Sequence, residues 1–178
     1  MLSKLPVTRV TQTGPNCVLA CLESVSRDLG LEWTQATIIE KFRWECYADR
    51  ESEQPKGAVT LRHVPSLILG LGLAQELQFG TGIDSLEKLA PALERDDGFL
   101  LLAIYEGKEY DPLDADVTHP SAERKLHAVR AIEVVPGKHV AAMDPNPETR
   151  WTNMRRPWSD LAGRAFHVIA GWTKPHLW

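Results

Sequence analysis

The spacing of apolar residues changes once along this chain of 178 residues, near Gly98. Before that point, apolar side chains recur at the helical period in four segments, at about 18–30, 34–42, 59–71 and 85–96. After it, four apolar or alternating runs have the length of strands, at about 99–107, 126–135, 139–145 and 165–173. Helices that precede a set of hairpin-connected strands indicate an α+β protein with an antiparallel sheet.

Capping residues and prolines set the expected limits of these elements. Thr34 caps the second helix, and Asp84 or Ser85 caps the fourth. Pro65 fits the third helix only in its first turn or at a kink, because proline removes a backbone donor. Two shorter pieces complete the expected order, an extended segment at 75–79 and a helix at about 158–163.

The length suits one hydrophobic core, so we expect a single domain of residues 1–178, with a helical lobe at about 1–97 and a sheet lobe at about 98–178. Hydrophobic residues make up 43% and charged residues 25% of the chain, as in ordinary globular proteins. No stretch approaches the roughly 20 apolar residues of a membrane span. A net charge of -4 without a dense run of lysine and arginine argues against a nucleic-acid surface. We therefore expect a soluble protein that binds neither membrane nor nucleic acid.

The three cysteines are Cys17, Cys21 and Cys46. They are too few and too unevenly spaced for a disulfide framework, and their odd number leaves at least one free thiol, which favours a reducing compartment. The first residues contain neither the apolar core nor the cleavage site of a secretory signal. The expected location is therefore the cytoplasm, or a target cell that the protein reaches by export without a cleaved signal peptide.

Cys17 is the candidate nucleophile. It follows the turn-forming string Thr13-Gly14-Pro15-Asn16 and begins the first expected helix. At that position, free backbone N–H groups and the positive end of the helix dipole favour the thiolate, which is the nucleophilic form. Cys21 lies one turn further along the same helical face, where we expect a buried core thiol. Cys46 has no neighbouring feature that would activate it.

A thiol nucleophile needs a histidine as general base and a carboxylate or amide that orients the ring. His127 begins one strand of an expected hairpin and Asp144 ends the other, on either side of a turn at 136–138. Antiparallel pairing places the first residue of one strand beside the last residue of its partner. His127 lies eight residues before Val135 and Asp144 lies six residues after Lys138, so the pairing requires a small offset or a bulge.

Gln12 is the candidate that stabilises an oxyanion. The tetrahedral intermediate of acyl transfer needs N–H donors, usually a backbone amide near the nucleophile and a side-chain amide. Gln12 lies five residues before Cys17, across the turn, and supplies the side-chain amide, while the backbone N–H of Cys17 supplies the other donor. Taken alone, Gln12 could be an ordinary polar loop residue and Cys17 an ordinary buried cysteine. The assignment of a catalytic site therefore depends on the four candidate residues together.

The remaining polar residues support rival sites less well. Five further histidines have no partner suggested by spacing, and we expect them to be structural or exposed, with His167 as the alternative base; they are His63, His119, His139, His167 and His176. Cys17 and Cys21 lie four residues apart with no second pair at ligand spacing, which argues against zinc. No phosphate-binding or dinucleotide motif occurs. We therefore expect neither a metal nor another cofactor.

The sequence resembles the papain-like peptidases that process double-glycine bacteriocin leaders in three strings, QTGPNCVLACLESV, LHAVRAIEVVPGKHVAAMDPNP and PWSDLAGRAFHVIAGW. In those peptidases a glutamine precedes a cysteine that opens a helix, a histidine begins a strand, an Asp-Pro pair ends the next strand, and a tryptophan motif precedes the last strand. The resemblance implies a papain-like fold with the nucleophile helix packed on the sheet. It also implies that Gln12 forms the oxyanion hole, Cys17 attacks, His127 acts as base and then acid, and Asp144 orients His127.

The resemblance implies a cysteine peptidase that cleaves a protein or peptide substrate, with the segment 106–124 as the expected place of substrate contacts. Val18 stands where the leader peptidases carry glycine, and the 178 residues include no transporter, so the chain is equally similar to papain-like bacterial effector and toxin domains. A toxin of this kind would have a cognate inhibitor or immunity protein as a partner. The same machinery serves deamidation, transglutamination or another acyl transfer. The alternative from another class is a papain-like protein-binding module without turnover.

Overall fold

The computed structural model describes residues 1–14, 16–43, 45–46, 59–105, 126–146 and 155–174. In chain order, the elements within these ranges are α1 (Cys17–Asp28), α2 (Gln35–Lys41), the 3-10 helix η1 (Leu61–His63), α3 (Val64–Gly70), β1 (Glu76–Thr81), α4 (Gly82–Leu89), the 3-10 helix η2 (Ala90–Glu94), β2 (Phe99–Tyr105), β3 (Leu126–Val135), β4 (His139–Met143), β5 (Arg155–Pro157), α5 (Trp158–Ala162) and β6 (Phe166–Trp172). None of the helices in these ranges has the length and apolar character needed to cross a membrane.

The six strands form one antiparallel sheet in the order β1-β6-β2-β3-β4-β5. β2 lies between β6 and β3, with Leu101 opposite both Ile169 and Arg130. β3 and β4 form the hairpin expected around residues 136–138, and their register shifts once, just after Ala131. The predicted α+β class with an antiparallel sheet is therefore confirmed.

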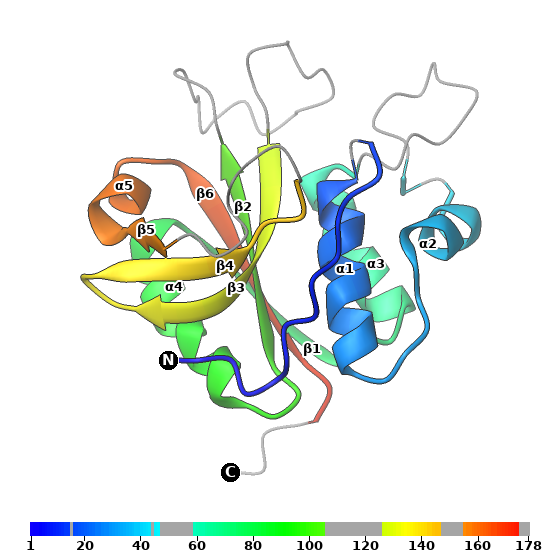
Figure 1. Ribbon diagram of the computed structural model, residues 1–178, viewed down its shortest axis with the longest axis horizontal. Coiled ribbons are helices and arrows are strands. Elements are labelled where there is room, and N and C mark those ends of the chain that lie inside the picture. The colour runs from blue at the N-terminus through cyan, green and yellow to red at the C-terminus, as the bar shows by residue number, and fades with distance from the viewer. Residues whose placement is uncertain (15, 44, 47–58, 106–125, 147–154, 175–178) are drawn as a thin grey trace.

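Apolar side chains cover both faces of the sheet. One cluster joins α1, α2 and α3 to the sheet and includes Leu101 of β2, whereas a second cluster joins α4, η2 and α5 to the opposite face and includes Leu100 and Leu102. Successive β2 side chains thus enter different clusters, which explains why this strand is an unbroken apolar run in the sequence. Figure 1 shows the two groups of helices on opposite sides of the sheet.

Most local signals in the helical half correspond to the observed ends of helices. α1 begins at Cys17. Thr34 caps α2 as predicted, because its side chain accepts from the Thr37 N–H and the Thr37 hydroxyl accepts from the Thr34 N–H. Pro65 lies in the first turn of α3. A backbone N–H at that position would have no acceptor within the helix, so the proline costs no helical hydrogen bond.

The predicted start of the fourth helix is wrong. α4 begins at Gly82, before both proposed caps, and the Ser85 hydroxyl accepts from the Thr81 N–H at 3.0 Å. The helix also ends earlier than expected, at Leu89, and continues as the 3-10 helix η2 around Pro91. Proline removes a backbone donor inside the expected helix, which accounts for this break.

The first 97 residues also contribute to the sheet. β1, at the position of the predicted extended segment, pairs with β6 along its whole length from Glu76 opposite Trp172 to Thr81 opposite His167. α4 follows β1 and packs on the face of the sheet opposite α1. The helical half of the sequence is therefore divided between the two faces of the sheet.

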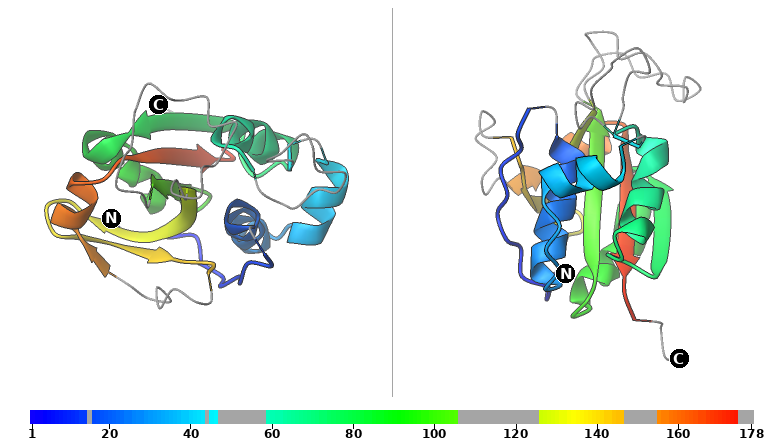
Figure 2. Two further views of the ribbon diagram at one scale, coloured as in Figure 1. Left: turned by 90° about the horizontal axis from the view of Figure 1, so that it is seen from above. Right: turned by 90° about the vertical axis from the view of Figure 1, so that its right-hand side faces the viewer.

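The N-terminal segment lies along α1, and Figures 1 and 2 show it passing beside that helix before the chain turns back into α1. The Ser24 hydroxyl of α1 donates to the Thr8 carbonyl, and the Thr8 N–H donates to the Asp28 carboxylate at the end of α1. This path places the loop before the helix next to the end of the β3–β4 hairpin.

Candidate active site

Cys17 is partly buried and is the first residue of α1. The preceding turn holds Gly14 at a φ of 66°, a conformation in which a Cβ is strained. Asn16 is buried, and its side-chain amide donates to the Thr13 hydroxyl at 3.1 Å. The N–H groups of a first helical turn have no acceptor within the helix, so Cys17 lies at the positive end of the helix dipole.

The other two cysteines are buried. Cys21, one turn along α1, points toward β3 and donates from its thiol to the Ala128 carbonyl at 3.6 Å. Burial and the negative charge of Cys17 raise the pKa of the Cys21 thiol well above its ordinary value. Burial and the neighbouring Glu45 raise the pKa of Cys46 to about 11. The expectation that Cys21 is a core thiol is confirmed, and neither thiol has the surroundings of a nucleophile.

The β3–β4 hairpin brings His127 and Asp144 together, with 2.7 Å between Nε2 of the ring and Oδ1 of the carboxylate. Arg130 is opposite Met143 in the register, so the two site residues are diagonal neighbours and not directly opposite. The pairing predicted from the sequence required a small offset or a bulge, and the structure has a register shift of this kind just after Ala131.

Asp144 is held from two sides. Its side chain is fully buried, and the oxygen that contacts His127 also accepts from the Asn146 N–H at 2.8 Å. A carboxylate with a fixed direction also fixes the ring that donates to it. The position just after β4 therefore determines how the His127 imidazole is oriented.

Two opposing effects act on the His127 ring, whose side chain is 12% exposed. Burial disfavours the charged ring, whereas hydrogen bonds to Asp144 and Cys17 and the negative charges of both favour it. The favourable effects are larger and raise the pKa of His127 to about 10. Because Asp144 engages Nε2, Nδ1 is the ring nitrogen that remains for the Cys17 sulfur. An imidazolium in this place can stabilise a thiolate and later donate a proton.

Gln12 lies in the loop before α1, and its side-chain Nε2 donates to the Gly14 carbonyl at 2.7 Å. An amide nitrogen has two N–H donors, so this bond orients the group and leaves a second donor for another acceptor. The backbone N–H of Gln12 donates to the Pro145 carbonyl at 2.9 Å, one residue after Asp144. The glutamine loop is therefore attached directly to the segment that carries the orienting carboxylate.

The alternative base, His167, lies elsewhere in the sheet. It is on β6, opposite Thr81 of β1 and Ala103 of β2, and β6 is two strands away from β3. Burial lowers its pKa. Burial therefore disfavours the imidazolium form of His167, whereas the pKa of His127 is raised.

Two of the histidines that we expected to be structural or exposed have hydrogen-bond partners close in sequence. These partners are Thr60 for His63 and Glu133 for His139. His119, His176 and the expected substrate segment 106–124 lie outside the described residues. Within the described ranges, no three side chains of histidine, cysteine, aspartate or glutamate gather in a way that could hold a metal ion.

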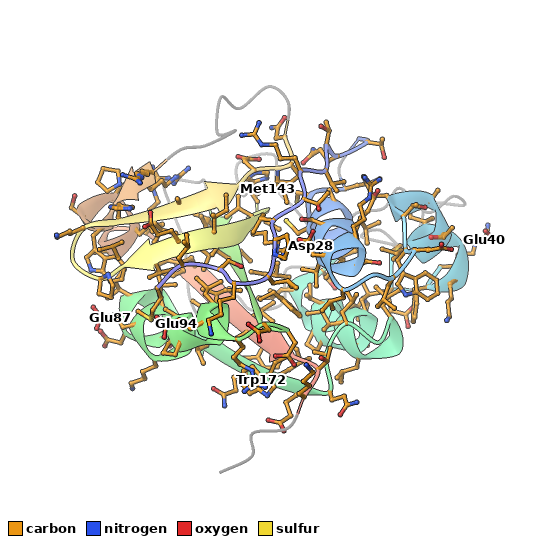
Figure 3. The ribbon with its side chains drawn as sticks, turned by 60° about the horizontal axis from the view of Figure 1, so that its bottom comes forward. Asp28, Glu40, Glu87, Glu94, Met143 and Trp172 are labelled. Carbon is orange, nitrogen blue, oxygen red and sulfur yellow. The ribbon has the colours of Figure 1, made fainter. Side chains whose placement is uncertain are left out.

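A buried ion pair behind the site was not predicted. The Arg130 side chain of β3 contacts the Asp28 carboxylate at the end of α1, and both are at least 98% buried. Arg130 also donates to the Ser24 hydroxyl at 2.7 Å and to the Pro6 carbonyl at 3.0 Å. Figure 3 shows Asp28 between α1 and the N-terminal segment. This pair joins the helix of Cys17 to the strand of His127, and a charge within an apolar strand was its only signal in the sequence.

A second unpredicted group is a buried polar network beneath the Gln12 loop, formed by Glu23 of α1 and Gln35 of α2. In the sequence, Gln35 follows a capping threonine and has the character of an ordinary helix residue. No spacing rule relates it to Gln12, because the two are brought together only by the turn between α1 and α2.

Comparison with known proteins bears on the fold. No protein-family model matches the sequence, and no curated protein matches it. Among solved structures, the chain is similar to the crystal structure of the peptidase domain of Streptococcus ComA, a bi-functional ABC transporter involved in a quorum-sensing pathway. The TM-score is 0.58 at 14% sequence identity, and the match covers 94% of this chain and 100% of that domain. The chain therefore has the fold of a papain-like peptidase domain, as the sequence resemblance implied.

Proposed function

We propose that the chain is a cysteine peptidase in which Cys17 is the nucleophile, His127 the general base and acid, Asp144 the orienting carboxylate and Gln12 an oxyanion donor. The observation that carries this proposal is the 2.7 Å hydrogen bond between Asp144 and His127, together with the effect of Cys17, the first residue of α1, in raising the pKa of His127. The fold shared with the peptidase domain of ComA supports the same reaction class.

In the first half of the reaction, the Cys17 sulfur attacks the carbonyl carbon of a peptide bond. The carbonyl oxygen becomes an oxyanion between the Cys17 backbone N–H and the second N–H of the Gln12 amide. His127, which carries the thiol proton, gives that proton to the leaving amine as the C–N bond breaks. The products are a thioester on Cys17 and a free amine.

In the second half, His127 takes a proton from water, and the resulting hydroxide attacks the thioester carbon. The same donors hold the second oxyanion. The C–S bond then breaks, the acid is released, and the Cys17–His127 pair returns to its starting state. Apart from the substrate and one water, every step uses side chains of this chain and the backbone N–H of Cys17.

The substrate class of the proposal is a protein or peptide. The most specific substrate that the sequence resemblance suggests is a leader peptide ending in two glycines. This chain differs from the leader peptidases at the residue after the nucleophile, where it has Val18. Val18 is the second residue of α1, and its side chain is buried in the core between this helix and the sheet. The difference therefore alters packing behind the nucleophile and not the exposed surface.

The biological part of the proposal is a bacterial effector or toxin domain that acts in the cytoplasm or in a target cell. A cognate inhibitor or immunity protein that covers Cys17 would then be a partner. Co-expression with proteins encoded beside it tests this directly, since an inhibitor of this kind copurifies with the wild type and blocks alkylation of Cys17.

The function is tested by profiling new protein N-termini with mass spectrometry in cells that express the wild type, Cys17→Ala or Cys46→Ala. Cys46→Ala is the matched control, because it removes a buried thiol outside the site. We expect new termini with the wild type and with Cys46→Ala, and none with Cys17→Ala. The residues before each cleavage point reveal the specificity, including any preference for two glycines.

Two other outcomes separate the alternatives. If no termini appear while Cys17 is still selectively alkylated, the chain does not cut backbone peptide bonds, and the reaction is deamidation of a side-chain amide, transglutamination or another acyl transfer. If Cys17 also shows no selective reactivity, the chain is a protein-binding module with a papain-like fold.

A further inference from the structure

The backbone on both sides of Gln12 is held by one side chain, the amide of Gln35 at the start of α2. Its Oε1 accepts from the Thr13 N–H at 2.9 Å and from the Thr13 hydroxyl at 3.1 Å. Its Nε2 donates to the Thr11 carbonyl at 3.1 Å. The residues directly before and after Gln12 are therefore bonded to opposite ends of the same amide.

Gln35 is in turn held by the helix that carries the nucleophile. Both its backbone N–H and its Nε2 donate to Oε2 of Glu23 on α1, each at 3.1 Å. The other oxygen of Glu23 accepts from Arg27, one turn further along α1. Gln35 is 7% exposed and Glu23 is 4% exposed, so water does not compete strongly for these bonds.

This network connects the two proposed donors of the oxyanion hole. Cys17 and Glu23 belong to the same rigid helix, and Gln35 relates that helix to the backbone at Thr11 and Thr13. The distance between the Gln12 amide and the Cys17 backbone N–H therefore depends on Gln35. A misplacement of about 1 Å in a reacting geometry costs up to about 100-fold in rate, so such a connection affects turnover.

We propose that Gln35 is a positioning residue for the oxyanion hole, with Glu23 as the group that holds it. This inference rests on the proposed function and adds a role that acts only through Gln12. Gln35 supports the tetrahedral intermediate without touching substrate, and it has no part in the Cys17–His127 pair.

Two reactions of Cys17 distinguish this role from a general structural one. Acylation by p-nitrophenyl acetate passes through a tetrahedral oxyanion and needs the oxyanion hole. Alkylation by iodoacetamide is a displacement at a saturated carbon, forms no oxyanion, and needs only the activated thiol. Loss of Gln35 therefore lowers the rate of acylation and leaves the rate of alkylation unchanged.

The experiment is a double-mutant cycle with Gln12→Ala, Gln35→Ala and the double variant, and Cys17→Ala gives the background rate. Gln12→Ala removes a donor, which costs about 100- to 1,000-fold in comparable enzymes. We expect Gln35→Ala to slow acylation by at least about tenfold in the wild-type background and by less than about twofold when Gln12 is already replaced. All these variants that retain Cys17 keep the wild-type alkylation rate.

Thr34→Ala is the matched control for α2. It removes the cap and weakens the same end of the helix without removing a bond between Gln35 and the Gln12 loop. We expect acylation by this variant to stay within about twofold of the wild type, because the donor geometry is preserved. A loss in Thr34→Ala as large as the loss in Gln35→Ala would assign the effect to α2 as a whole and overturn the proposal.

Gln35→Glu gives a second readout if Gln35→Ala does not fold. The charged groups at this position are the Glu23 carboxylate, which contacts residue 35, and Arg27, which is bonded to the other oxygen of Glu23. An ionised carboxylate at residue 35 repels both the Glu23 carboxylate and the Thr11 carbonyl. A protonated carboxyl can still donate to Thr11. The ratio of acylation rates between this variant and the wild type therefore rises as the pH falls.

Equal loss from Gln35→Ala with and without Gln12 would show that Gln35 acts by another route, and a flat pH ratio in Gln35→Glu would contradict the hydrogen bond to Thr11. Failure of the proposed function gives a different result, since the wild type itself would then show no acylation above Cys17→Ala and no selective alkylation of Cys17.

Discussion

His127 and Asp144 are diagonal neighbours across the β3–β4 hairpin, with 2.7 Å between Nε2 and Oδ1. One register shift in β3 makes this approach possible, and one carboxylate oxygen serves both His127 and the Asn146 N–H. The other ring nitrogen, Nδ1, thereby remains for Cys17, which helps to raise the pKa of the ring. The orientation of the His127 ring in the proposed chemistry depends on this relationship.

Replacing Asp144 separates orientation from charge. In Asp144→Asn the side-chain oxygen can still accept from His127 and Asn146, so the ring keeps its direction, whereas Asp144→Ala removes both bonds. We expect Asp144→Asn to keep a substantial part of the acylation rate with p-nitrophenyl acetate, and Asp144→Ala to lose at least about 100-fold. Equal losses in the two variants would show that the negative charge, and not the orientation, is what Asp144 contributes.

The raised pKa of His127 makes stability depend on pH in a defined direction. The folded protein holds the His127 proton up to about pH 10, whereas the unfolded chain releases it near its ordinary value of about 6.5. The stabilisation is therefore fully present below about pH 6.5 and is lost as the pH rises through about 10. Urea unfolding of the wild type and of His127→Ala at several pH values should show the difference in free energy of unfolding shrinking over this interval.

His63→Ala is the control for that experiment, because it removes an imidazole that does not contact Cys17 or Asp144. It therefore shows how far the loss of an imidazole outside the site changes the free energy of unfolding. A wild-type stability that rises through this interval relative to His127→Ala would contradict the charged state of the ring.

Replacing one member of the buried pair of Arg130 and Asp28 should lower the free energy of unfolding much more than replacing both. Arg130→Met leaves the Asp28 carboxylate without its buried counter-charge, and we expect a loss of about 3–5 kcal/mol in the free energy of unfolding. In the double variant Arg130→Met/Asp28→Asn, no uncompensated charge remains, so part of this loss should be recovered. Urea denaturation of the two variants checks this, and a double variant less stable than Arg130→Met would refute it.

Much of the fold follows from local patterns. The change of periodicity near Gly98 separates helices from strands, and Thr34 and Pro65 mark helix starts through simple rules about N–H donors. The hairpin follows from two alternating runs and a turn, and the count of residues on each side predicts a small offset or a bulge, of which the structure shows a register shift after Ala131. Cys17, His127 and Asp144 can be found by the same local patterns, because each stands at or beside the end of an element, whereas Gln12 is found only by its place in the loop before α1.

The remaining features depend on contacts between distant segments. β1 completes the sheet through β6, which begins 85 residues after the end of β1 at Thr81, and sequence pattern does not encode that partner. Arg130 and Gln35 are polar residues that become buried on folding. Arg130 lies 102 residues from Asp28, and Gln35 lies 22 and 24 residues from Thr13 and Thr11. Their ordinary appearance in the sequence is expected, since a polar residue becomes part of a buried network only when folding supplies its partners.

The central claim is that His127 activates Cys17, and native alkylation tests it most directly. Wild-type protein and His127→Ala are treated with limiting iodoacetamide near neutral pH, and labelled cysteines are mapped by mass spectrometry. We predict rapid labelling of Cys17 in the wild type, with Cys21 and Cys46 unlabelled because burial keeps both thiols protonated, and loss of that rapid labelling in His127→Ala. Labelling of Cys17 that is slow in the wild type, or equally fast in both proteins, would contradict the claim.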